Sequence, residues 1–337
     1  MLKDNIVKRL NWVDGLRGFL ILLVILGHSI QYFPGIEADD NHLWNMIYSF
    51  HMPAFMAVSG FLNYRSGRGR RDRGTIIYHR LFQLLIPFFV WSLISSLSDA
   101  STVFYQLVDD IKYPDRSFWF LWALFWISIL FVCTDYLSEK IRIKQEIGEC
   151  VAAVVLVGIM TLTEFRYFGF QFIAYYFLFY IAGYYYRKNE KYIPDNKVVV
   201  GLLIFLWAIL AWFYSPHRLP DFLREAPLVP SALLLYGYRF ATSTIACFVL
   251  FALAPKVLDT NNLINRILWT FGKVSLGMYV VHLLLCRKLV VCMVNTIGMN
   301  STELIIITFI LLTSISYGLV YLLGKNKYTA KFLLGKL

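Results

Sequence analysis

The fold is decided by residues 12–29, which read WVDGLRGFLILLVILGHS. An unbroken apolar run over residues 19–26 separates Arg17 from His28. With its flanks, the apolar segment reaches about 20 residues, the length that an α-helix needs to cross the hydrocarbon core of a bilayer. No small-residue cleavage site follows it, so we expect a permanent first membrane span rather than a removable signal peptide.

The composition extends this interpretation to the whole chain. Hydrophobic residues make up 58% of the 337 positions, charged residues make up only 16%, and the mean hydropathy is +0.59. A water-soluble fold would expose too much apolar surface, so lipid is the natural solvent. We therefore predict an all-α integral membrane protein with about ten transmembrane helices. The expected spans cover residues 13–33, 43–63, 77–98, 117–135, 148–163, 168–186, 197–214, 231–253, 273–295 and 303–323.

The positions of Lys and Arg predict which side of the membrane each loop faces. Basic residues are dense before the first span, and again in every second loop up to the C-terminus, but sparse in the alternate loops. Loops rich in Lys and Arg stay in the cytoplasm, so both termini are predicted to be cytoplasmic. The formal charge of +11 is then mainly a topology signal, and we expect no nucleic-acid partner.

A single membrane domain over residues 1–337 is the simplest organisation. The sequence contains no repeat period, low-complexity tract or large soluble insertion. Its five cysteines lie in or beside apolar segments and lack the paired spacing of a zinc site or a disulfide framework. We interpret them as buried small hydrophobic residues, and expect neither a metal site nor a permanently bound cofactor.

Ionisable side chains inside membrane spans are energetically expensive, so each one is a functional hypothesis. Arg17 and His28 lie 11 positions apart in the first span. On an α-helix this separation brings them within roughly 20° of the same face and about 16 Å apart along the axis. One face of this helix is thus predicted to carry an arginine near the cytoplasm and a histidine toward the far side.

The second span places His51 at a depth comparable with that of His28, counted from the outer ends of the two helices. Pro53 follows shortly after and removes a backbone hydrogen bond. Membrane helices tolerate such a break where the freed carbonyl lines a cavity or finds another partner. Further ionisable residues within later spans are Arg239, His282, Arg287 and Lys288.

Each of these features also has a purely structural explanation. A histidine within a span is often an interhelical hydrogen-bond partner. Lys288 can extend toward the outer interface, and the arginine-rich loop at 65–73 can be only a positive-inside anchor. The aromatic run at 118–122 is typical of an interface belt. Both explanations stay open for the individual residues.

Four ordered motifs resemble the acyltransferase 3 family of membrane-embedded bacterial O-acyltransferases. The first joins DGLRG at 14–18 to His28, with ten residues between Arg17 and His28. The second, FHMPAFMAVSGF at 50–61, is similar to the branch that contains fucose O-acetylase-like proteins. The others are FWFL at 118–121 and GKVSLGMYVVH at 272–282. The chain is thus identified as an acyltransferase 3-like transmembrane domain.

The third expected span departs from the family pattern. Members usually carry Arg-x-x-Arg there, just ahead of a proline, whereas this sequence has Arg80-Leu-Phe-Gln83 before Pro87. Arg70 and Arg73 have the right mutual spacing but lie too early in the sequence to match that motif well.

The resemblance implies transfer of an acyl group, most often acetyl, from cytoplasmic acyl-CoA to a sugar hydroxyl. The acceptor would be an envelope polysaccharide, oligosaccharide or polyprenyl-linked precursor, and the enzyme a multi-pass protein among the lipids of the bacterial cytoplasmic membrane. The reaction needs a base for the hydroxyl proton, donors for the thioester oxyanion and cations for the CoA phosphates. Histidine suits the first task because its side chain titrates near neutrality.

These needs give the residues their expected roles. His28 is the candidate base, and His51 is a second catalytic or orienting group. The residues expected to hold the CoA phosphates are Arg17, Arg80, Arg70 and Arg73. The residues expected at the acceptor are Asp14, Ser29, Tyr48 and Arg239, the last of which can also face an oxyanion.

Two other functions remain open. A transporter or flippase for an anionic glycan-type substrate would also have about ten spans, broken helices and buried basic groups. A sensor or assembly subunit could keep the scaffold without catalysis, and Gln83 at the place of the usual arginine keeps that alternative open. The presence of both Arg17 and His28 favours the acyltransferase.

Overall fold

The computed structural model describes residues 10–64, 73–97, 103–163, 165–193, 196–224, 230–296 and 301–336. Every regular element within these ranges is helical, which confirms the predicted all-α class. The longer helices are α1 (Asn11–Gln31), α7 (Trp119–Lys140), α8 (Gln145–Leu162), α9 (Phe170–Asn189), α12 (Ser231–Val257), α14 (Ser275–Thr296) and α15 (Ser301–Leu323). The shorter ones are α2 (His42–Tyr48), α3 (His51–Asn63), α4 (Arg73–Arg80), α5 (Ile86–Ser96), α6 (Val103–Lys112), α10 (Lys197–Trp212), α11 (Asp221–Arg224), α13 (Leu263–Lys273) and α16 (Lys327–Phe332).

Within the described ranges, seven helices are long and apolar enough to cross a membrane. They are residues 11–31, 73–96, 119–140, 145–162, 231–257, 275–293 and 302–323, and each overlaps one of the expected spans. The span at 73–96 consists of α4, a π-helical turn η2 (Leu81–Leu85) and α5 in succession. A multi-pass membrane fold is therefore confirmed, whereas the count of about ten and the cytoplasmic placement of both termini stay predictions.

The other three expected spans differ from a single long apolar helix. The span expected at 43–63 is divided into α2 and α3, and α3 has only 13 residues. The one expected at 197–214 forms α10, which has 16 residues. The one expected at 168–186 forms α9, whose 20 residues include many tyrosines that lower its hydropathy.

The break between α2 and α3 follows from Pro53, which cannot donate a hydrogen bond to the carbonyl of Ser49 four residues earlier. That carbonyl oxygen accepts a hydrogen bond from the Ser243 hydroxyl of α12 instead, at 2.5 Å. The freed carbonyl thus has a partner on another helix, as membrane proteins require of irregular backbone. The result is that His51 begins α3 deep in the protein rather than continuing α2.

Glycines allow two pairs of helices to cross at very short range. A Cβ added at Gly60 of α3 would lie 1.8 Å from the carbonyl oxygen of Tyr180 in α9, and one added at Gly183 of α9 would lie 1.8 Å from that of Ala57. The same reciprocal contact joins α1 to α13, through Gly18 and Gly272. Small residues at such crossings bring backbones together where no hydrophobic effect drives helix association.

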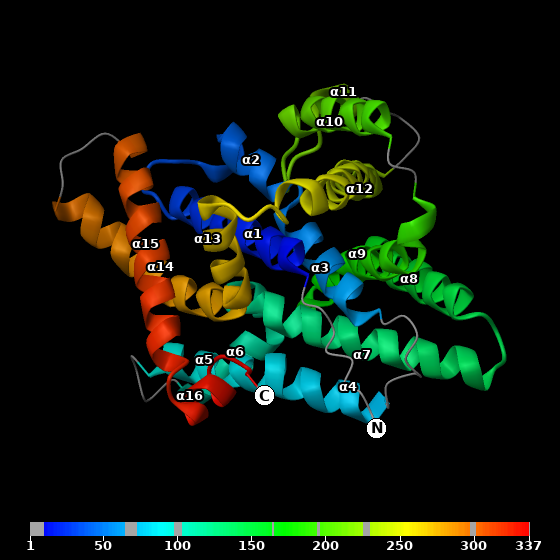
Figure 1. Ribbon diagram of the computed structural model, residues 1–337, viewed down its shortest axis with the longest axis horizontal. Coiled ribbons are helices and arrows are strands. Elements are labelled where there is room, and N and C mark those ends of the chain that lie inside the picture. The colour runs from blue at the N-terminus through cyan, green and yellow to red at the C-terminus, as the bar shows by residue number, and fades with distance from the viewer. Residues whose placement is uncertain are drawn as a thin grey trace.

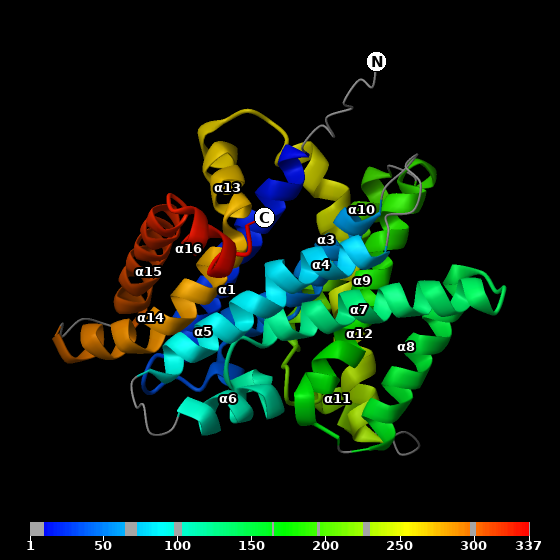
Figure 2. The same ribbon diagram turned by 90° about the horizontal axis from the view of Figure 1, so that it is seen from below.

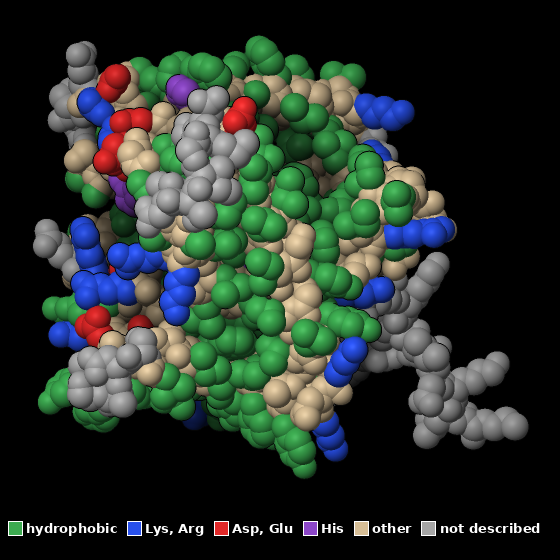
Figure 3. All heavy atoms as spheres, turned by 90° about the vertical axis from the view of Figure 1, so that its left-hand side faces the viewer, with side chains coloured by type: hydrophobic (Ala, Val, Ile, Leu, Met, Phe, Trp, Pro, Cys, Tyr) green, Lys and Arg blue, Asp and Glu red, His purple; other side chains and the backbone are tan. Residues whose placement is uncertain are grey.

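These contacts place α1 and α3 in the middle of the molecule. Figure 1 shows α13 to α16 on one side of them and α7 to α9 on the other, and the perpendicular view in Figure 2 agrees. The space-filling view in Figure 3 shows a broad hydrophobic surface with charged side chains along two opposite margins. On this face, Asp and Glu gather at one margin together with Lys and Arg, while the opposite margin carries Lys and Arg. Such a band between charged margins is typical of a protein surrounded by lipid.

Candidate active site

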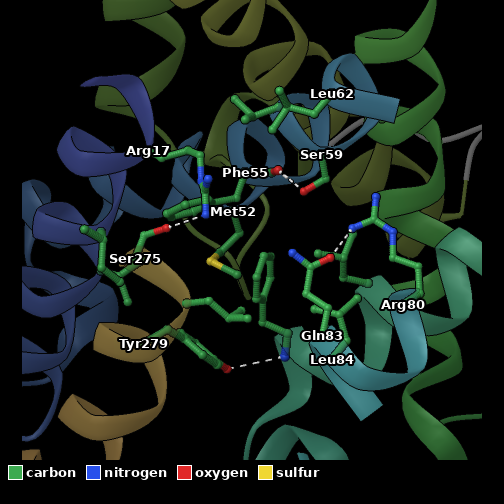
Figure 4. Close-up of a pocket in the computed structure, with 16 residues that line it drawn as sticks. Arg17, Met52, Phe55, Ser59, Leu62, Arg80, Gln83, Leu84, Ser275 and Tyr279 are labelled. Atoms are coloured by element: carbon green, nitrogen blue, oxygen red, sulfur yellow. Dashed lines mark hydrogen bonds between the residues drawn. The ribbon is translucent and has the colours of Figure 1, made fainter. Parts of the chain in front are cut away.

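A small cavity of about 100 Å³, which we call the arginine cavity, lies between α1, α3, α14 and the η2 turn. Arg17 and Ser275 lie on one side of it, and Arg80 and Gln83 on the other (Figure 4). The Arg17 guanidinium donates a hydrogen bond to the Ser275 hydroxyl at 3.0 Å. Two of the arginines that the sequence predicts for the donor therefore share one cavity.

The π-helical turn η2 explains how Arg80 and Gln83 both reach this cavity. Pro87 cannot donate to the carbonyl of Gln83, and the wider π turn directly precedes it. Turns of this kind inside α-helices are frequent at functional sites. Arg80 Nη1 donates to Gln83 Oε1 at 3.1 Å, so the glutamine orients the arginine. The residue that departs from the family pattern is thus part of the cavity wall.

A larger cavity of about 520 Å³, which we call the histidine cavity, lies beyond it. Four of the predicted site residues line this cavity, namely His28, Tyr48, His51 and Arg239. Its wall combines carboxylates with aromatic rings. The carboxylates are Glu37, Asp39, Asp110 and Asp115, and the rings include Trp44, Trp119, Phe172 and Tyr176.

The aromatic rings of the histidine cavity are ordered into stacks. Trp119 stacks on Phe172 with ring centroids 4.5 Å apart and on Tyr176 at 5.4 Å. Trp44 stacks on Tyr48 at 3.8 Å, and the Tyr48 hydroxyl donates to Gln31 Oε1 at 2.7 Å. Apolar ring faces beside carboxylates suit a polar ligand that also has apolar faces, such as a sugar.

His28 is in contact with a second histidine of a distant helix. Its Nδ1 lies 2.8 Å from Nε2 of His282 in α14, and the two ring planes are tilted by only 16°. His282 Nδ1 in turn lies 2.9 Å from the carbonyl oxygen of Met278, one turn earlier in the same helix. The third histidine, His51, has its Nδ1 2.7 Å from the carbonyl oxygen of Ile47.

Met52 and Tyr279 line both cavities and thus form the wall between them. The Tyr279 hydroxyl accepts a hydrogen bond from the backbone N–H of Phe120 at 3.3 Å, which ties α14 to the start of α7. Ser275, Tyr279 and His282 occupy one face of α14, since they are separated by about one helical turn each. This face of α14 therefore contacts Arg17 at one cavity and His28 at the other.

Arg239 reaches the histidine cavity from α12. Its guanidinium carbon lies 5.0 Å from the centre of the Tyr175 ring and 5.6 Å from that of Tyr236, both within the range of cation–π interactions. Its Nε is buried and has no hydrogen-bond partner among the described residues.

The structure does not bring every predicted residue to the cavities. Arg73 forms ion pairs with Asp135, at 3.0 Å, and with Glu139, both on α7. Arg70 lies outside the described residues. Asp14 is buried beside Arg17, at 3.9 Å, and lines neither cavity. Ser29 is buried as well, and its hydroxyl donates to the carbonyl of Ile25 at 2.8 Å.

The sequence alone does not reveal the places of Ser275, Tyr279 and His282 at the two cavities. All three belong to the motif at 272–282, and their spacing places them on one helical face. That pattern was visible, but nothing in the sequence says which helix this face meets. Gln83 was noticed only as a departure from a motif.

Comparison with known proteins supports the family resemblance that the four motifs indicate. A family model described as an acyltransferase domain matches residues 10–325. Nodulation protein NolL of Sinorhizobium fredii is 27% identical over 293 residues, which cover 80% of this chain and 76% of the relative. Nodulation protein NolL of Mesorhizobium japonicum is 34% identical over 168 residues, which cover 46% of this chain and 44% of the relative. No solved structure matches the chain.

The matched range contains all four motifs on which the resemblance rests, together with both cavities' histidines and arginines. It also contains the seven helices that are long and apolar enough to cross a membrane. The chain belongs to the acyltransferase domain family, the acyltransferase 3 family that its motifs resemble, and is a membrane acyltransferase.

Proposed function

We propose that the protein transfers an acyl group, in the first instance acetyl, from acyl-CoA at the arginine cavity to a sugar hydroxyl at the histidine cavity. The observation that carries this proposal is the shared wall of Met52 and Tyr279, because two substrates can meet there from opposite sides. Arginines suit the phosphates of CoA, whereas carboxylates and aromatic rings suit a sugar.

The size of the arginine cavity supports an entry for only part of the donor. At about 100 Å³ it is smaller than the pockets of roughly 300–1,000 Å³ that enclose a drug-sized ligand. The thioester end of the pantetheine arm is narrow enough to enter, while the nucleotide stays outside. Arg17 and Arg80 then hold negative charge at the mouth of the path.

The chemistry assigns the base to His28. The acceptor hydroxyl gives its proton to an unprotonated ring nitrogen of His28 while its oxygen attacks the thioester carbonyl carbon. The tetrahedral intermediate then loses the CoA sulfur, which takes the proton from His28, and the acyl ester remains on the sugar. Arg239 lines the same cavity and is the candidate donor for the developing oxyanion, whereas His51, whose Nδ1 faces the carbonyl oxygen of Ile47, is an orienting group.

The family setting and the lining of the histidine cavity support one acceptor class. We propose an envelope glycan or a polyprenyl-linked sugar precursor in the bacterial cytoplasmic membrane, with the donor supplied from the cytoplasm. The nodulation proteins that this chain resembles do not by themselves identify its acceptor.

A reconstituted assay tests the proposal against the transporter alternative. Purified protein in proteoliposomes receives acetyl-CoA labelled in the acetyl group on the side of the N-terminus, and lipid-linked glycans from the native membrane serve as acceptors. We expect release of CoA together with label in the glycan fraction. Movement of glycan across the bilayer without CoA release would instead establish a transporter. Mass spectrometry of envelope glycans from cells with and without the gene then identifies the acceptor by its lost acetyl mass.

A further inference from the structure

The contact between His28 and His282 defines which ring nitrogens carry hydrogen. A backbone carbonyl oxygen can only accept a hydrogen bond, and the Met278 carbonyl oxygen lies 2.9 Å from His282 Nδ1. His282 Nδ1 therefore carries a hydrogen. Neither His28 nor His282 forms an ion pair with a carboxylate among the described residues, so we treat both rings as neutral. In a neutral ring only one nitrogen is protonated, which leaves His282 Nε2 with a lone pair.

This arrangement determines the tautomer of His28. Because His282 Nε2 can only accept, the 2.8 Å contact requires His28 Nδ1 to be the donor. The other nitrogen of His28, Nε2, then has the lone pair that a general base needs. An imidazole free in water prefers the opposite tautomer, with hydrogen on Nε2, so the partner at Nδ1 decides the state of the ring.

We propose that His282 is a positioning residue that holds His28 in its base-competent tautomer. The inference rests on the proposed function and deepens it, since it assigns the atom of His28 that accepts the hydroxyl proton. When Nε2 takes that proton, His28 becomes an imidazolium whose Nδ1–H still donates to His282. A neutral histidine thus does for His28 what a carboxylate or carbonyl does for histidines in other sites, by fixing both tautomer and ring orientation.

The hydrogen-bond partner of His28 is a side chain, whereas the partner of His51 is a backbone carbonyl. His51 Nδ1 faces the carbonyl of Ile47, so its tautomer is determined by backbone that no side-chain substitution removes. The partner of His28 is a side chain from a helix 254 residues away in sequence. Substituting His282 therefore tests the role directly, and His51 serves as an internal reference.

Nitrogen NMR of the intact protein in lipid nanodiscs tests the tautomer without any assay of transfer. The chain has only 6 histidines, so selective ¹⁵N-histidine labelling gives a tractable spectrum. We expect His28, assigned by the loss of its signals in His28→Asn, to show a protonated Nδ1 and an unprotonated Nε2. In His282→Leu the same ring should change toward the Nε2-protonated form, while His51 keeps its pattern. A wild-type His28 protonated at Nε2 alone would overturn the proposal.

Kinetics separate this role from general structural damage. His282→Gln retains a side-chain oxygen that can accept from His28 Nδ1–H, whereas His282→Leu has no acceptor. We expect His282→Leu to lower the turnover rate about 100-fold or more with little change in acyl-CoA affinity, and His282→Gln to recover much of the loss. His42→Gln is the matched control, because His42 is exposed, stacks on Trp212 and lines neither cavity.

The two experiments fail in distinguishable ways. The expected spectrum in a protein that transfers no acyl group would refute the proposed function and leave the tautomer assignment intact. Normal turnover in His282→Leu, with native folding, would refute the positioning role and leave the acyltransferase proposal standing.

Discussion

Met52 of α3 and Tyr279 of α14 are, among the described lining residues, the only two that belong to both cavities. The helices that carry them come from opposite ends of the sequence, and each is held by its own contacts. The Tyr279 hydroxyl accepts a hydrogen bond from the backbone N–H of Phe120, and α3 packs closely against α9 at Gly60 and Gly183. The wall between the cavities is thus narrow and well supported, and the proposed acyl path crosses it.

Enlarging Met52 should block this path. We expect Met52→Trp to lower the turnover rate at saturating donor by about tenfold or more, since a misplacement of about 1 Å already costs a large factor in rate. The affinity for acyl-CoA should change little, because the arginines lie on the near side of the wall. Leu206→Trp, at an exposed position of α10, is the control for an added indole. Unchanged turnover in Met52→Trp would place the acyl path elsewhere.

Arg17 and Arg73 allow a matched test of the donor site. Arg17 lines the arginine cavity, whereas Arg73 is paired with Asp135 and Glu139 on α7. Loss of a hydrogen bond from a charged group costs about 1.5–3 kcal/mol, so Arg17→Gln should weaken acyl-CoA binding by roughly 10–100-fold. We expect Arg73→Gln to bind the donor as the wild type does. Equilibrium binding of acetyl-CoA to protein in nanodiscs measures both, and equal losses would contradict the assignment of the cavity.

Removing the base should abolish transfer while the protein still inserts. His28→Ala is expected to lower acyl transfer by about 10²–10⁴-fold, the range that general base catalysis contributes. Membrane insertion and donor binding should persist, because His28 lines the histidine cavity rather than the arginine cavity. The measurement is label transfer in proteoliposomes with matched protein amounts, beside His42→Ala. Near-normal transfer by His28→Ala would exclude it as the base.

The features that the sequence predicts well are local ones. Arg17 and His28 are on one helix, so the helical repeat alone places them on one face, at two depths, and the structure finds one at each cavity. The sequence also predicts that Pro53 frees a backbone carbonyl, because its missing N–H affects only the carbonyl four residues earlier in the same helix. The overall membrane character follows from composition in the same way.

The features that the sequence leaves open depend on contacts between distant helices. Nothing local says that His282 meets His28, or that Ser243 of α12 satisfies the carbonyl that Pro53 frees. Arg73 was grouped with the donor-binding residues because it lies in an arginine-rich segment, yet its partners are acidic residues of α7. Charge density in the sequence does not show which charges are already neutralised in the fold.

The crossing of α3 and α9 supplies the last prediction, which links packing to activity. An added methyl group at Gly60 or Gly183 would lie 1.8 Å from a backbone carbonyl oxygen of the partner helix, so the helices must separate. Overpacking of this kind costs about 1–3 kcal/mol, and we expect Gly60→Ala and Gly183→Ala to unfold at lower temperature in detergent. Gly158→Ala is the control, because nothing lies within 4 Å of the added group and alanine favours the helix.

Since α3 carries Met52 and His51, the two destabilised variants should also lose transfer activity below their unfolding temperature. A variant with a lowered unfolding temperature but full activity would show that the wall between the cavities does not depend on this crossing.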